Sequence, residues 1–262
     1  MIKFHYGCRR KKKLGSETAK SGFKFEKVVE NSLLNFRINS LGKDLLIETG
    51  IDIENIIDIE KLPKRNNEKS DVRVLIKLKN NDVVFNISCK SYGDASFNQI
   101  DKRPVNKYTE IFNFPDEVTV ALKKFTGEIN DGINERKYFD QLLKEERRNI
   151  LDYFKKISKE VIELVFMGNG SNKINWVVLR KKETSNEKER INIIPVSFCT
   201  AWANGEVRES KIHRGHISTF SIGKIKIQRK GGTPDPNSLQ FKFSPGDLQE
   251  AYLEFNECRI DS

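Results

Sequence analysis

The stretch "SDVRVLIKLKNNDVVFNISCK", residues 70–90, constrains the fold of this chain more than any other segment. On both sides of the pair Asn80-Asn81, apolar residues recur at every second position, and a period of two is typical of half-buried β-strands. Asn also tolerates the positive φ angles that tight turns require. We therefore predict a β-hairpin whose two-residue loop is Asn80-Asn81, so that residue 79 pairs with residue 82.

This register brings the polar ends of the two strands together. Asp71 falls opposite Lys90, and Ser88 is a diagonal neighbour on the same face, whereas Cys89 points into the core. The arrangement has two interpretations. It is either an exposed cross-strand ion pair, which contributes little to stability, or the polar centre of a functional site.

An acid and a lysine on adjacent strands, with an oxygen-bearing side chain two residues before the lysine, are similar to the layout of the PD-(D/E)xK nucleases. Mg²⁺ takes oxygen ligands and keeps several waters, so Asp71 is the expected metal ligand. Lys90 would orient or activate the attacking water and offset charge in the transition state. Ser88 stands where a second acid is expected; its hydroxyl would bind the metal weakly, act through a water or merely avoid burying a charge.

A further carboxylate comes from an expected helix between about Ser21 and Asn39, in which apolar residues recur at helical spacing. Glu26 borders the apolar face and is a candidate third metal ligand; the alternative is a solvated helix charge. The basic run "RRKKK" before this helix predicts an N-terminal arm over residues 1–14. Such a run is either a solubilising tail or an arm that lies on phosphates.

Composition narrows the class of protein. The formal net charge is +10, from 47 Lys and Arg against 37 Asp and Glu, so the surface attracts polyanions, of which nucleic acid is the commonest. A merely soluble basic protein is the alternative. The four cysteines form no CxxC pair, which argues against a zinc ribbon or redox motif and favours the reducing cytoplasm. No apolar run approaches the roughly 20 residues of a membrane span, so we expect no membrane partner.

Helical and strand patterns alternate along the rest of the chain. We expect helices from Asp116 and between Glu135 and Phe166, then strands in "KINWVVLRKK" and "INIIP", and further strands before a closing helix in "DLQEAYLEF". The pattern predicts a mixed α/β fold. We expect a catalytic core over 15–166 and a β-rich region over 167–262 packed on it, either separate or as one continuous domain.

The motifs "GSETAKSGFKFEK", "KSD", "FNQIDK", "FTGE", "IQRKGG" and "LQFKF" occur in this order, and with them the chain resembles the small monomeric type II restriction endonucleases of the HinP type, which are akin to the MspI enzyme. The resemblance runs from about Gly15 to Leu248. It implies a central mixed β-sheet flanked by helices, with a C-terminal β-rich DNA-recognition region. It also implies Mg²⁺-dependent hydrolysis of double-stranded DNA, with Mn²⁺ as a substitute.

Further properties follow from the resemblance alone. The expected site is GCGC, cut after the first G to leave 5′-phosphate ends. A bacterial cytoplasmic monomer is expected, with a dimer on DNA as the alternative, together with a DNA methyltransferase that acts on the same site. The family's metal-binding aspartate falls on Asp71, its lysine on Lys90 and its helical glutamate on Glu26, and Ser70 also matches. Ser88 replaces the family's glutamine.

The resemblance also implies a set of DNA-binding residues. Arg and Lys pair with guanine N7 and O6 in the major groove, and Gln and Asn pair with base edges, so these residue types suit a site of G and C. The glycines Gly231 and Gly232 would let the backbone approach DNA. A solvated strand face is the alternative. The expected residues are Gln228, Arg229, Lys230, Gln240, Lys242, Asn98, Gln99 and Lys102.

Two other functions stay open at this point. Ser88 allows a catalytically weak or inactive DNA-binding protein that keeps the nuclease fold, and the charge alone allows an RNA-binding protein. His213 and His216 in "HRGH" lack a third ligand, so we interpret them as loop histidines near phosphate rather than a metal pair.

Overall fold

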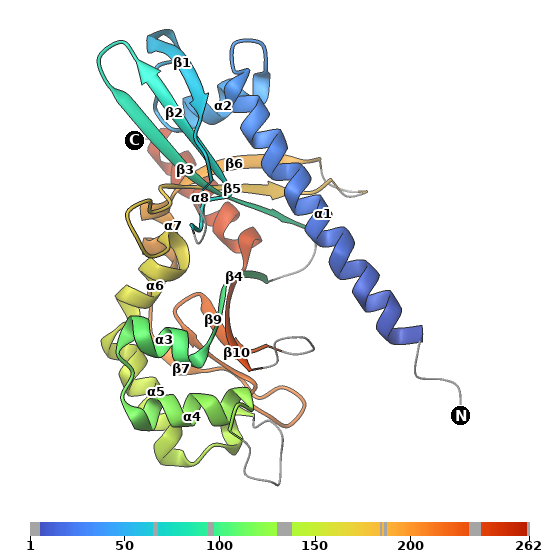
Figure 1. The fold of residues 1–262 in the computed structure, drawn as a ribbon, viewed down its shortest axis with the longest axis vertical. Helices are drawn as coiled ribbons and strands as arrows, with labels where there is room; N and C mark the ends of the chain where they lie inside the picture. Colours follow the sequence, from blue (N-terminus) through green and yellow to red (C-terminus); the bar gives the residue numbers. More distant parts are fainter. Residues whose placement is uncertain are drawn as a thin grey trace. The chain divides into compact units, whose positions relative to one another are not determined.

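The computed structural model describes residues 6–64, 68–93, 97–129, 138–183, 185, 188–230 and 237–260, with side chains from residue 20 to residue 258 (Figure 1). The chain divides into two compact units. Unit 1 contains residues 1–95, 167–197 and 252–262, and unit 2 contains residues 96–166 and 198–251. Each unit has a five-stranded sheet, and the expected mixed α/β class is confirmed.

The sheet of unit 1 has the strand order β1-β2-β3-β5-β6. Its strands are β1 (Ile56–Lys61), β2 (Val72–Leu78), β3 (Asp82–Tyr92), β5 (Trp176–Lys181) and β6 (Arg190–Pro195). Strands β3 and β5 pair in parallel, and the other neighbours are antiparallel. The expected central mixed sheet is therefore present.

The hairpin β2–β3 has a different register from the predicted one. Lys77 pairs with Asp82, and the N–H of Leu78 donates to the carbonyl of Asn81 at 2.9 Å, so the loop is Lys79-Asn80 rather than Asn80-Asn81. The register shifts by two positions, and an even shift keeps every side chain on its predicted face. The ladder puts Val72 opposite Ile87, so Asp71 lies beside Ser88 and not opposite Lys90.

Helix α1 (Tyr6–Leu34) covers the sheet of unit 1 with Phe25, Val29 and Leu33, all of which are buried. It begins earlier and ends earlier than the predicted helix, so the run expected as a basic arm is helical. The helix does not reach Asn39 because this residue caps the next helix, α2 (Ser40–Glu48). The Asn39 side chain accepts from the N–H of Gly42 at 3.0 Å.

The sheet of unit 2 is antiparallel throughout, with the order β4-β10-β9-β8-β7. Its strands are β4 (Asn98–Pro104), β7 (Val207–Glu209), β8 (Thr219–Ile222), β9 (Ile225–Arg229) and β10 (Ser238–Phe243). Phe220 and Phe241 are fully buried on one face, beside Phe125, Phe139 and Tyr108. The opposite face is polar.

Helices complete the fold. They are α3 (Val105–Phe112), α4 (Asp116–Thr126), α5 (Lys144–Lys156), α6 (Ser158–Met167), α7 (Val196–Ala203) and α8 (Pro245–Ile260), with the short turns η1 (Ile53–Asn55) and η2 (Phe139–Gln141). In the described parts of the chain, no helix combines the length and apolarity needed to cross a bilayer.

The division into units differs from the expected boundaries of 15–166 and 167–262. Residues 96–166 belong to the same unit as the C-terminal strands, because β4 pairs with β10 along its whole length. Pairing between strands so far apart in sequence leaves no local pattern that a reading of the sequence could detect.

Candidate active site

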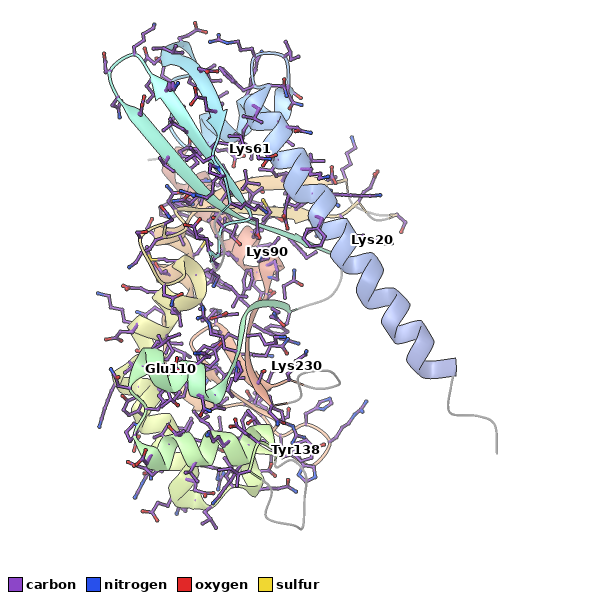
Figure 2. All side chains as sticks on the ribbon, viewed as in Figure 1. Lys20, Lys61, Lys90, Glu110, Tyr138 and Lys230 are labelled. Carbon is purple, nitrogen blue, oxygen red and sulfur yellow. The ribbon has the colours of Figure 1, made fainter. Side chains whose placement is uncertain are left out.

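Three groups of strand β3 converge on one oxygen of Asp71. Its Oδ2 accepts from the backbone N–H of Cys89 at 2.7 Å and from the hydroxyl of Ser88 at 3.2 Å, and the Lys90 ammonium lies 3.4 Å away. Figure 2 labels Lys90 on this strand. The sequence correctly predicts which side chains meet, although the register that brings them together is different.

The end of the β2–β3 ladder explains this geometry. The N–H of Asp71 donates to the carbonyl of Ile87 at 2.8 Å, and the β2–β3 ladder ends there. The N–H of Cys89, which a longer ladder would have paired with a backbone carbonyl, donates to the Asp71 carboxylate instead. The side chains of Asp71 and Lys90 are 23% and 24% exposed. The pair is therefore partly shielded from water while still open to a ligand.

The pKa of the Cys89 thiol depends on the charges around the site. Burial raises its pKa well above the usual value; Asp71 and Glu26 raise it further, whereas Lys90 and Lys64 lower it. The thiol is therefore held neutral and is unsuited to act as a nucleophile. Both carboxylates therefore act electrostatically on this one buried group.

Glu26 is engaged by a lysine that the sequence did not indicate. Its carboxylate forms an ion pair with the ammonium of Lys64 at 3.1 Å, and its side chain is only 18% exposed. A cation bound near Glu26 would therefore compete with Lys64, whose own side chain is 52% exposed and has room to move.

The oxygen-rich surroundings of Asp71 fit a hard divalent cation. The hydroxyl of Ser70 is buried without a hydrogen-bond partner among the described residues, and it directly precedes Asp71. Within the same described ranges, no cluster of three or more His, Cys, Asp or Glu side chains could hold a metal. A cation at Asp71 would therefore take most of its ligands from hydroxyls, water and substrate, as Mg²⁺ commonly does.

The sequence did not predict a buried polar network around Arg73, two residues after Asp71. The guanidinium of Arg73 donates to Asn86 Oδ1 at 2.9 Å and to the Pro63 carbonyl at 3.1 Å, and it lies 3.2 Å from the Glu68 carboxylate. Asn172 bonds both Arg73 and Glu68. The network ties segment 63–68, which leads into Asp71, to the strand pair. Asn86 in a strand whose neighbours are apolar was the available signal.

The polar face of unit 2 is a glutamine face, which carries Gln99, Gln228 and Gln240 on three strands. Gln240 of β10 pairs with Gln228 of β9 in the ladder, and Gln228 Nε2 donates to Gln240 Oε1 at 3.0 Å. The Gln240 amide in turn donates to Gln99 of β4. Lys102 of β4 lies opposite Gln240. Predicted DNA-binding residues from distant segments are thus adjacent here.

A second row on this face contains Lys242, whose ladder partners are Gln99 on β4 and Lys226 on β9. Burial lowers the pKa of Lys242 below its ordinary value. The ammonium of Lys226 lies 3.8 Å from the centre of the Phe97 ring. Asn98 pairs with Phe243 at the end of the ladder.

Arg229 differs from the other predicted DNA-binding residues. It pairs with the buried Leu239, so alternation directs it to the opposite face from Gln228, and its guanidinium lies 4.8 Å from the Tyr138 ring centre. The backbone N–H of Lys230 donates to the Ser238 carbonyl at 2.8 Å. Gly231 and Gly232 fall outside the described residues.

Comparisons with known proteins identify the chain. The family model described as R.HinP1I restriction endonuclease matches residues 49–249. The chain belongs to this family. Among solved structures, restriction endonuclease MspI in complex with its cognate DNA is similar, with a TM-score of 0.61 and 13% identity over 88% of this chain and 92% of that chain. At this identity the likeness supports the fold. No curated protein matches the chain.

Membership in the R.HinP1I family confirms the resemblance drawn from the motifs. The chain is a restriction endonuclease, and its enzymatic class is that of a site-specific deoxyribonuclease. The matched range contains Asp71, Ser88 and Lys90. It also contains the glutamine face of unit 2. Helix α1 with Glu26 lies before it.

Proposed function

We propose that this restriction endonuclease hydrolyses double-stranded DNA at GCGC, with Mg²⁺ or Mn²⁺ as its cofactor, and cuts after the first G. The observation that carries the proposal is the convergence of Ser88, Cys89 and Lys90 on the carboxylate of Asp71. The complex of MspI with its cognate DNA supports double-stranded DNA as the substrate. The site GCGC and the cut position rest on the sequence resemblance.

The chemistry follows from the residues around Asp71. Asp71, the hydroxyls of Ser70 and Ser88 and the carboxylate of Glu26 would hold a divalent cation, which would supply Lewis acidity at the scissile phosphate. The N–H of Cys89 fixes the orientation of the Asp71 carboxylate. Lys90 orients the attacking water and offsets the negative charge that develops on the phosphoryl oxygens. In-line attack by this water leaves a 5′-phosphate and a 3′-hydroxyl.

Recognition belongs to the polar face of unit 2. The amides of Gln99, Gln240 and Gln228 hold one another in fixed orientations, so each presents defined donors and acceptors to base edges. Lys102 and Lys242 add cations suited to guanine N7 and O6. Lys230 and Asn98 lie at the ends of the strands that carry this face. Arg229 lies on the opposite face, so it would contribute to recognition only through its contact with Tyr138.

A single catalytic centre per chain is consistent with a monomer that cuts the two strands in successive events. A dimer on DNA is the alternative arrangement. A DNA methyltransferase specific for GCGC would protect the host genome without binding this enzyme.

Digestion of a sequenced plasmid with purified protein and Mg²⁺ tests the proposal. We expect fragments from every GCGC site, with ends that map after the first G. The variant Asp71→Asn is the control and should bind the GCGC duplex without cutting it. Ends at other sequences would refute the proposed specificity.

A DNA-binding protein without catalysis is the second candidate, and Ser88 in place of the glutamine of its relatives favours it. Salt-sensitive binding to a GCGC duplex, with no nicking in either Mg²⁺ or Mn²⁺, would select this candidate over the proposed cleavage activity.

A further inference from the structure

A tight hairpin in unit 2 connects β7 to β8 and is not part of either site described above. His213 and His216 exchange backbone hydrogen bonds of 2.9 and 3.2 Å, which leaves Arg214 and Gly215 as a two-residue loop. Both loop residues have positive φ angles, +53° and +81°. Arg214 is one of only two non-glycine residues with positive φ in the described part of the chain.

An arginine is an unfavourable choice for this position. Two-residue loops with two positive φ angles prefer Asn-Gly or Asp-Gly, because Asn and Asp adopt the left-handed conformation more readily than residues with long side chains. The hairpin therefore accepts a local conformational cost and places a guanidinium at its tip. A cost of this kind points to a function for the side chain.

The tip is exposed and carries an excess of positive charge. Lys211, His213 and Arg214 are exposed, and residues 210–217 contain no acidic residue. The preceding acid, Glu209, is already paired with Arg147 at 3.1 Å. Within the described residues, no carboxylate forms an ion pair with Lys211 or Arg214.

The base of the hairpin is held firmly. The ring of His216 stacks on Tyr138 at 4.2 Å with an interplanar angle of 1°, and its Nδ1 lies 3.3 Å from Asp140. Asp140 also accepts from the N–H of Ile217 at 3.0 Å, and the N–H of Phe139 donates to the Ile217 carbonyl at 2.7 Å. The tip is thus presented on a rigid support, which lowers the entropy lost on binding.

The same support joins the hairpin to the strand proposed to read DNA. Tyr138 contacts Arg229, which lies between Gln228 and Lys230 in sequence. Thr219 at the start of β8 pairs with Gln228, so the hairpin and Lys230 lie at the same end of the sheet. Figure 2 labels Tyr138 and Lys230 in this part of unit 2.

We propose that the hairpin tip, through Lys211 and Arg214, is a DNA backbone clamp that binds phosphates beside the sequence read by the glutamine face. The inference rests on the proposed function, because it requires double-stranded DNA as the ligand. Phosphate contacts carry no sequence information, so the clamp strengthens binding to all duplexes equally. Each contact also adds to the salt dependence of binding, because phosphate neutralisation releases counterions.

The test uses the full chain without divalent cations, a GCGC duplex and a scrambled duplex of equal length. The variant Arg214→Asn removes the charge and favours the turn, so the hairpin is kept; Lys211→Gln is combined with it. Arg148→Gln, on the exposed surface of α5, is the matched control. We expect the double variant to bind both duplexes more weakly by the same factor. The slope of log K against log salt should fall by about 0.9 per lost contact.

An unchanged slope, or a loss confined to the GCGC duplex, would overturn the clamp while leaving the nuclease proposal intact. A loss of binding free energy in the Arg148 control of half the double variant's loss or more would also overturn it, because each removed charge would then count equally wherever it lies. A wild-type chain that binds neither duplex refutes the clamp and the proposed function together. Binding of both duplexes without preference refutes only the GCGC specificity.

Discussion

At the scale of single residues, Asp71 is defined by what donates to it. A backbone N–H, a hydroxyl and an ammonium all approach the same oxygen, and these contacts fix the orientation of the carboxylate. Ser88 fits this pattern as a donor to Asp71. It is therefore a means of orienting Asp71 as well as a candidate ligand.

We expect Lys90→Met to reduce the rate of cleavage by about 100-fold or more while the affinity for the GCGC duplex changes little, because the lost charge acts mainly in the transition state. Single-turnover cleavage and equilibrium binding measure the two effects separately. Lys61→Met is the matched control, since Lys61 is an exposed lysine of the same unit whose partner is Glu30. Similar losses in both variants would contradict the role of Lys90.

Lys242 predicts a pH dependence of DNA binding. Burial lowers its pKa, so this lysine loses its charge at a lower pH than an exposed lysine does. The affinity for DNA should therefore begin to fall as the pH rises towards the ordinary lysine pKa of about 10.4. Lys242→Arg keeps the charge and should hold the affinity over this range. Two results would contradict a role for the Lys242 charge. The affinities of wild type and Lys242→Arg could change in parallel from about pH 7 to about pH 10, or the control Lys226→Arg could preserve the affinity equally well.

At the scale of elements, strand β2 owes its position to a buried arginine. Arg73 is 6% exposed and holds Asn86 of the neighbouring strand and two segments outside the sheet. Removing one partner of a buried charge is strongly destabilising, although the complete network adds little net stability. We therefore interpret the network as fixing the geometry of this region.

We expect Arg73→Met to lower the free energy of unfolding by about 3 kcal/mol, because the largely buried Glu68 carboxylate would lose its cationic partner. Denaturant unfolding measures the change. Adding Glu68→Gln should recover part of it. Lys77→Met, an exposed position on the same strand, is the control and should unfold like the wild type. At temperatures where Arg73→Met is folded, its cleavage rate should be reduced more than its DNA affinity, since the network leads into Asp71.

At the scale of the whole molecule, the two proposed tasks, catalysis and recognition of DNA, fall into different units. The Asp71 centre belongs to unit 1 and the glutamine face to unit 2. Each unit has its own five-stranded sheet and its own buried residues.

Removal of the metal should separate these tasks. With a chelator, we expect cleavage to disappear while the preference for GCGC over a scrambled duplex is kept, because the side chains proposed to read bases are not metal ligands. Restored Mg²⁺ or Mn²⁺ should recover cleavage. A chelated enzyme that binds both duplexes equally would show that the metal, not the glutamine face, sets the preference.

The sequence by itself determined which side chains share a face. The period of two in residues 70–90 put Asp71, Ser88 and Lys90 together, and this holds in the structure although the register is shifted by two positions. Alternation is a property of the backbone within a strand, so a local pattern is enough to predict it.

Only the tertiary structure decided which segments meet. The ion pair of Glu26 with Lys64, the addition of β4 beside β10 and the partners of Arg73 all depend on packing between segments distant in sequence. The free energy that selects among such pairings is spread over a whole core. A short window of residues is therefore not enough to predict which segments pair.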